Sequence, residues 1–134
     1  MAVVKSDRVP VQTEADIVSV RQMVRGWSQE LGFSLVDQTK IVTAASELAR
    51  NTIKHGGGGY LVLEMHNQGM KRGLKLVFED SGPGIPDIGM AMRDGFTTGG
   101  GLGLGLGGSK RLVNDFEINS KVGEGTRVTI TRWR

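Results

Sequence analysis

The sequence predicts one α/β domain, a two-layer α/β sandwich in which helices cover one face of a mixed, mostly antiparallel sheet. Three observations predict this class. The chain of 134 residues is long enough for one modest core and too short for two domains. Two stretches in its first half have apolar residues at helical spacing, and later alternating stretches form two pairs joined by glycine turns, which is typical of hairpins. Residues 1–134 are therefore expected to form a single domain.

The first two expected elements are a strand and a helix. Residues 3–11 alternate valine with polar side chains, which predicts a strand, and Pro10 assigns it to a sheet edge because proline has no N–H to donate. Thr13 is a typical helix N-cap. Apolar residues recur at helical spacing from Glu14 until Gly32, where the helix is expected to end.

A second helix and the remaining strands follow. Ser34 is expected to cap the second helix, which ends at His55 before the glycines 56–59. Beyond those glycines, alternating apolar and polar residues predict strands that are separated by turns and short helices. The expected elements are strands over 60–67 and 73–79, a short helix over 88–93, a longer helix over 106–115, and strands over 116–120 and 126–133.

The composition excludes several classes of chemistry. No cysteine is present, which excludes disulfides, thiolate zinc sites and thiol nucleophiles, and His55 and His66 are too few for a histidine-built metal centre. No apolar run approaches the roughly 18 residues of a membrane span, and the N-terminus does not resemble a secretory signal, so a cytoplasmic protein is expected. The net charge is +3, but the basic residues are scattered, so neither nucleic acid nor a membrane is an expected partner.

The most unusual stretch is rich in glycine. More than half of residues 95–108 are glycine, and each glycine inside a helix would cost about 1 kcal/mol relative to alanine, so a loop is expected there. Its backbone N–H groups could approach an anion closely, beside the N-terminus of the helix expected near Leu106. A flexible linker is the alternative, but the interleaved Leu102, Leu104 and Leu106 favour a phosphate-binding loop.

Two better-known phosphate motifs do not fit this loop. Gly103, Gly105 and Gly108 satisfy G-x-G-x-x-G, but the dinucleotide fingerprint needs a strand directly before it, and the preceding residues do not form such a pattern. The Walker A loop needs glycine before its lysine, whereas Ser109 precedes Lys110 here. An oxidoreductase is therefore a remote alternative.

Residues 46–56, SELARNTIKHG, place a carboxylate and an amide late in the second helix. Glu47 and Asn51 are four residues apart and share a face, where they can border a pocket. They could supply a general base and an oxygen ligand for Mg²⁺, and Lys54 could neutralise phosphate charge. The alternative is an ordinary solvated helix face.

The stretch FEDSGPGIP, residues 78–86, delivers Asp80 from a strand to a turn that contains Gly82 and Gly84. A carboxylate held at a strand end can accept a hydrogen bond from the amino group of a base such as adenine, and the glycines leave room for the ring. An ordinary Asp-Gly turn is the alternative for this stretch on its own.

Together, these motifs resemble a known family. E-x-x-x-N, D-x-G-x-G, the glycine loop and GEGT at residues 123–126 occur in this order, and the pattern is similar to that of the GHKL ATPase superfamily, whose nucleotide-binding domain has the Bergerat fold. The resemblance extends from Glu14 to the C-terminus. Within the superfamily, SELARN, EDSGPGIPDI, DGFTTGGGLGLGL and GEGT are similar to the RsbT-type serine/threonine switch kinases of bacterial stressosomes, which resemble the anti-sigma factor kinases.

The resemblance implies a role for each matching residue. Glu47 would be the base that orients or deprotonates the attacking hydroxyl, Asn51 the Mg²⁺ ligand and Asp80 the residue that reads adenine. The span 86–101 would act as a lid. For His55 the alternative to a nucleotide contact is a residue favoured by the helix dipole. The nucleotide-binding residues implied are Asn51, Lys54, His55, Asp80, Gly82, Gly84, Gly101, Gly103, Leu104, Gly105, Leu106 and Thr126.

The resemblance also implies an activity and partners. The chain would be an ATP- and Mg²⁺-dependent serine/threonine kinase that phosphorylates STAS-domain scaffold and antagonist proteins and, when released, binds and activates a PP2C-type phosphatase. An anti-sigma factor kinase that sequesters a sigma factor, and a nucleotide-gated binding module without kinase activity, are the alternatives. A histidine kinase core fits less well, because thirteen residues precede the first helix and Glu47 stands where histidine kinases commonly carry asparagine.

Overall fold

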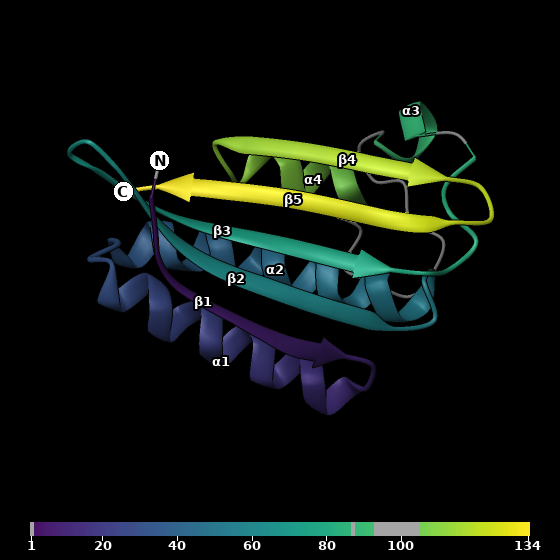
Figure 1. Cartoon of the computed structure of the whole chain (residues 1–134), viewed down its shortest axis with the longest axis horizontal. Helices are drawn as coiled ribbons and strands as arrows, with labels where there is room; N and C mark the ends of the chain where they lie inside the picture. The colour runs from purple at the N-terminus through teal and green to yellow at the C-terminus, as the bar shows by residue number, and fades with distance from the viewer. Residues whose placement is uncertain (1, 87, 93–104) are drawn as a thin grey trace.

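The structure is a computed structural model that describes residues 2–86, 88–92 and 105–134, and it has the predicted two layers (Figure 1). Its sheet has five strands in the order β1-β2-β3-β5-β4, and every neighbouring pair is antiparallel. The strands are β1 (Ala2–Val11), β2 (Gly59–Gln68), β3 (Lys71–Asp80), β4 (Asp115–Lys121) and β5 (Gly125–Trp133), and the helices are α1 (Glu14–Glu30), α2 (Leu35–Lys54), α3 (Ile88–Ala91) and α4 (Gly105–Arg111). Helices α1, α2 and α4 lie behind the sheet in Figure 1, so the predicted sandwich is confirmed, with only antiparallel pairs among the described strands.

The two long helices begin at the caps that the sequence predicts. Thr13 Oγ1 accepts the N–H of Asp16, and the carboxylate of Asp16 accepts the N–H of Thr13, which completes a capping box at α1. Ser34 caps α2 by accepting the N–H of Asp37 at 3.1 Å. Both predicted helix starts are therefore confirmed.

The strands are arranged as the turn signals predict. β1 lies at one edge of the sheet, as Pro10 indicates, and β4 lies at the other. The register of β1 against β2 shifts between Val3 and Lys5, an irregularity that is typical of edge strands. The two predicted hairpins, β2–β3 and β4–β5, are both present.

The last helix differs from the prediction. α4 ends at Arg111, so the helix expected over 106–115 was too long. Asn114 shows why the helix stops early. Its N–H donates to the carbonyl of Thr131 at 3.0 Å, and its Oδ1 accepts the N–H of Trp133 at 2.7 Å. Pairing with β5 therefore outweighs helical spacing in this segment.

The hydrophobic core lies between the helices and one face of the sheet. Trp27 is among its members, with 7% of its surface exposed, whereas Trp133 is half-buried. Other core residues are Ile17, Val20, Val24, Ile41, Ala45, Leu48, Leu61, Leu63, Leu76, Phe78 and Ile130. Within the described ranges, no helix combines the length and the hydropathy of a membrane span. The core fixes α2 along the sheet, so that the C-terminal end of α2 lies where β3 ends (Figure 1).

Candidate functional site

Asp80, the last residue of β3, has a carboxylate with a fixed orientation. Its Oδ1 accepts the N–H of Gly82 at 2.9 Å and the N–H of Thr126 at 3.3 Å. These two donors come from the turn after β3 and from β5, so two separate elements hold the same carboxylate oxygen. A carboxylate that is oriented by backbone donors can accept a further hydrogen bond from a ligand's amino group.

The end of α2 lies directly against this carboxylate because Gly56 has no side chain. A Cβ at Gly56 would lie 2.2 Å from Cγ of Asp80 and 2.4 Å from its Oδ2. Gly82 approaches the same place, since a Cβ there would lie 2.6 Å from Cα of Gly56. The sequence predicts Gly56 only as a helix stop, because its contact with Asp80 depends on a residue far along the chain. The glycines bring the helix end, the strand end and the turn together at one point.

The turn after β3 is tied to the β4–β5 hairpin through Ser120. Its Oγ accepts the N–H of Ile85 at 2.8 Å and lies 2.8 Å from Oγ1 of Thr126. Gly84 has a φ of +78°, a conformation that favours glycine. Sequence reasoning missed Ser120, because no motif marks a residue that meets the turn from so far along the chain. Thr126 is therefore placed beside Asp80 by both its backbone and its hydroxyl.

Glu47 is buried in α2, with 4% of its surface exposed. Its Oε1 accepts a hydrogen bond from Nη1 of Arg50 at 3.3 Å, one helical turn further on. A buried carboxylate needs such a partner, because leaving its charge unpaired would be costly. The alternative of a solvated helix face is therefore wrong for Glu47. Sequence reasoning did not identify Arg50, although its spacing of three residues could have indicated it.

The other predicted residues of α2 follow Glu47 toward the helix end. Asn51 is half-buried, whereas Lys54 and His55 are exposed. About 10 Å of helix axis separates Glu47 from Lys54, the last residue of α2, at a rise of about 1.5 Å per residue. This helix therefore carries a carboxylate, an amide and an ammonium group in successive turns that lead to Asp80. Such an arrangement suits an elongated ligand with a base at one end and phosphates at the other.

The described residues include only the last part of the glycine-rich stretch, from Gly105 onward. Gly101, Gly103 and Leu104 lie outside the described residues, and so does most of the expected lid over 86–101. Gly105 is the first residue of α4, which packs against α2. Leu106 is 8% exposed and belongs to the core. The roles implied for these residues stay predictions.

Comparisons with known proteins agree with this geometry. Residues 36–133 match the family described as "Histidine kinase-, DNA gyrase B-, and HSP90-like ATPase". The chain is 51% identical over 125 residues to the "Serine/threonine-protein kinase RsbT" of Bacillus subtilis (strain 168), and the alignment covers 93% of this chain and 94% of that protein. It is 30% identical over 118 residues to the "Anti-sigma F factor" of Clostridium kluyveri, covering 84% and 82% of the two chains.

Solved structures show a similar fold. One contains the RsbU and RsbW domains of Rv1364c from Mycobacterium tuberculosis; it has a TM-score of 0.63 at 23% identity and covers 98% of this chain. The match spans 33% of that longer chain. The mycobacterial sensor histidine kinase MprB has a TM-score of 0.56 at 16% identity, covering 96% of this chain and 97% of its own. At these identities the likeness concerns the fold alone.

Proposed function

Because the chain belongs to the histidine kinase-, DNA gyrase B- and HSP90-like ATPases, we propose that it binds ATP at the Asp80 end of the sheet and transfers the γ-phosphate to serine or threonine residues of partner proteins. The single observation that carries the site is the Asp80 carboxylate, which two backbone N–H groups hold against Gly56. The extensive identity to a serine/threonine-protein kinase supports the acceptor class.

Asp80 is the residue that recognises the base. Its oriented carboxylate accepts a hydrogen bond from the exocyclic amino group of adenine. Gly82 and Gly84 do not leave room for the ring, as the sequence predicts, but let the turn pack against the backbone of Gly56 and Lys121. Thr126 supports this end through its N–H to Asp80. The residues present therefore fit an adenine nucleotide.

Asn51 and Lys54 lie along α2 between the base end and Glu47. The amide oxygen of Asn51 is a suitable ligand for Mg²⁺, which commonly uses few protein ligands together with phosphate oxygens. When bound, Mg²⁺ would neutralise part of the negative charge of the phosphates. Further nucleotide contacts are proposed for Lys54, His55 and the glycine loop, whose members here are Gly101, Gly103, Leu104, Gly105 and Leu106.

Glu47 is the proposed general base. The hydroxyl oxygen of the acceptor serine or threonine forms the new bond to the γ-phosphorus, the bond from that phosphorus to the leaving oxygen of ADP breaks, and Glu47 takes the hydroxyl proton. Burial beside Arg50 holds the carboxylate in one place. A positioned base of this kind contributes about 10²- to 10⁴-fold to the rate.

The proposed acceptors are STAS-domain scaffold and antagonist proteins, and the proposed second partner is a PP2C-type phosphatase that the released kinase binds and activates. The relatives named RsbT and anti-sigma F factor support a partner-switching role of this kind. A cytoplasmic location accords with these partners. The relatives named anti-sigma F factor favour one second candidate, a kinase that also sequesters a sigma factor.

The test mixes the chain with Mg²⁺, γ-labelled ATP and STAS-domain proteins of its own source. Glu47→Ala is the test variant, and Glu64→Ala, which changes a carboxylate on a different element, is the matched control. Acid-stable label on serine or threonine that is lost only in Glu47→Ala supports the proposal. Acid-labile label, or full transfer by Glu47→Ala, contradicts it, and binding of a sigma factor without binding of any STAS-domain protein favours the second candidate.

A further inference from the structure

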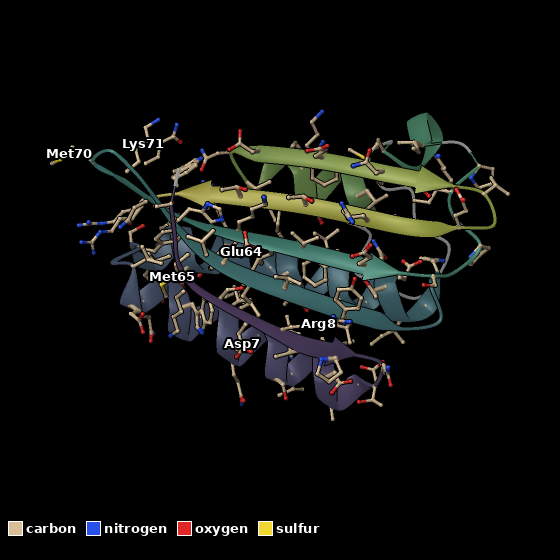
Figure 2. The ribbon with its side chains drawn as sticks, viewed as in Figure 1. Asp7, Arg8, Glu64, Met65, Met70 and Lys71 are labelled. Carbon is tan, nitrogen blue, oxygen red and sulfur yellow. The ribbon has the colours of Figure 1, made fainter. Side chains whose placement is uncertain are left out.

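On the face of the sheet opposite the helices, four side chains from four strands form a continuous row. The guanidinium carbon of Arg8 lies 3.7 Å from the centre of the Tyr60 ring. The Tyr60 hydroxyl donates to Oε2 of Glu79 at 2.5 Å, and Nη2 of Arg127 donates to Oε1 of Glu79 at 3.3 Å. Figure 2 shows the Arg8 side chain at β1, beside β2. We call Arg8, Tyr60, Glu79 and Arg127 the back row.

The back row lies directly behind the proposed adenine site. At the site, Asp80 of β3 pairs with Gly59 of β2 on one side and with Thr126 of β5 on the other. Each of these three residues is next in the chain to a member of the back row. Because side chains alternate along a strand, Glu79 and Asp80 point to opposite faces of the sheet. Each cross-strand bond in the back row is therefore one residue away from the site.

The site itself has few side chains that could hold its strands in register. A Cβ at Gly59 would lie 1.9 Å from the carbonyl oxygen of Glu79, and a Cβ at Gly125 would lie 2.2 Å from that of Asp80. Close approach of the three strand ends therefore requires glycine, and glycine gives the backbone extra freedom. Tyr60, Glu79 and Arg127 supply side-chain cross-links at the nearest available position.

We propose that Tyr60, Glu79 and Arg127 are positioning residues, which hold Asp80 in the orientation that distinguishes the exocyclic amino group of adenine from a carbonyl oxygen. The inference rests on the proposed role of Asp80 in base recognition. A carboxylate accepts a hydrogen bond from the amino group of adenine but repels the oxygen that hypoxanthine carries at the same place. Because hydrogen bonds weaken steeply with misalignment, a loosened Asp80 discriminates less between the two bases.

The experiment compares the dissociation constants of MgATP and MgITP in the unaltered chain and in Tyr60→Phe. The substitution removes the hydroxyl that bonds Glu79 and keeps the ring beneath Arg8. We expect the ratio of the two constants to fall about three- to tenfold, since part of the base discrimination depends on hydrogen-bond alignment. A merely structural loss would lower the fraction of active protein for both nucleotides and leave their ratio unchanged.

Glu64→Gln is the matched control, because Glu64 also lies on β2 and its carboxylate bonds Nε2 of His66 at 2.8 Å, further from the site. The ratio should not change in this variant. Glu79→Gln provides a second test should Tyr60→Phe fold poorly, since it keeps an acceptor for Tyr60 but removes the charge that faces Arg127. Its expected reduction of the ratio is smaller.

Two failures are distinguishable. A chain that discriminates between ATP and ITP, and whose folded Tyr60→Phe and Glu79→Gln variants keep the full ratio, would overturn the inference and leave the proposed function intact. An unaltered chain that binds ATP and ITP equally, or binds neither, would overturn the proposed role of Asp80 and the inference with it.

Discussion

The two ends of the sheet are held together by different kinds of contact. At the end that carries Asp80, glycines and backbone N–H groups bring the helical layer and the turn after β3 against the sheet, and the side-chain links of the back row lie on the opposite face. At the other end, where Figure 2 labels Met70 and Lys71 at the tip of the β2–β3 hairpin, side chains make them. There Arg132 of β5 forms an ion pair with Asp37 of α2 and donates a hydrogen bond to a carbonyl that follows α4. We call these the glycine end and the ion-pair end.

The difference separates two tasks. At the glycine end, strands and helix approach closely enough for backbone donors to orient one carboxylate, and this end suits the binding of a ligand. At the ion-pair end, long side chains cross-link the helical layer and the sheet, and this end secures the fold. Substitutions at the glycine end should therefore have their largest effect on nucleotide affinity, and those at the ion-pair end should have their largest effect on stability.

The largest effect is expected for Gly56→Ala. The new Cβ would lie 2.2 Å from Cγ of Asp80, so the carboxylate must move. A hydrogen bond to a charged group is worth about 1.5–3 kcal/mol, so we expect a loss of ATP affinity of about 10- to 100-fold in calorimetric titration. Gly26→Ala in α1 is the control, since a Cβ there meets nothing within 4 Å. Unchanged affinity in a folded Gly56→Ala protein would contradict the location of the site.

A smaller effect, on stability alone, is expected for Asp37→Asn at the ion-pair end. The change leaves the charge of Arg132, whose side chain is 14% exposed, without its carboxylate. We expect the free energy of unfolding to fall by about 2 kcal/mol, less than for a fully buried pair because both side chains keep some contact with water. Urea unfolding measures this, with the exposed Asp7→Asn as control.

The ATP affinity of Asp37→Asn should stay within about twofold of the unaltered value, since a structural change far from the ligand has no differential effect on the bound state. If Asp37→Asn lost much of its ATP affinity and kept its stability, ligand binding and fold stability would not be divided between the two ends of the sheet.

The smallest effect concerns pH at the glycine end. The hydrogen bond from Tyr60, together with Arg127, lowers the pKa of Glu79 from its ordinary value of 4.5, although burial opposes this. The ionised form is therefore favoured in the folded state, so its contribution to stability is present above the ordinary pKa and is lost as pH falls through the lowered one. Urea unfolding of the unaltered chain and of Glu79→Gln should show a difference near neutral pH that shrinks below about pH 4. A difference that grows on acidification would contradict this assignment.

Local chemistry made the caps and the edge strand predictable. Thr13 and Ser34 accept hydrogen bonds from residues three positions on, and Pro10 lacks a donor, so each acts within a few residues of its own position. The fourth helix was predicted too long because Asn114 pairs with β5, a contact that depends on the folded sheet.

The site was only partly predictable for the same reason. Asp80 and Glu47 stand in recognisable motifs, whereas Ser120 and Gly56 acquire their contacts from other elements. Helical periodicity placed Glu47 on a face that could border a pocket, but it could not show that the carboxylate is buried. The identities of neighbours across the sheet follow from strand order, which a single sequence does not contain.

The pairing of β3 with β5, which joins the two hairpins and is called the seam here, also affects folding kinetics. Asp80 and Thr126 belong to different hairpins and are 46 residues apart, and the bond between them crosses the β3–β5 pairing. Each hairpin can form from local contacts, whereas closing the seam carries the entropic cost of a long loop. A refolding chain should therefore become able to bind ATP only when β3 and β5 have paired. Because ATP binds only the folded state, it should slow unfolding without accelerating the formation of either hairpin.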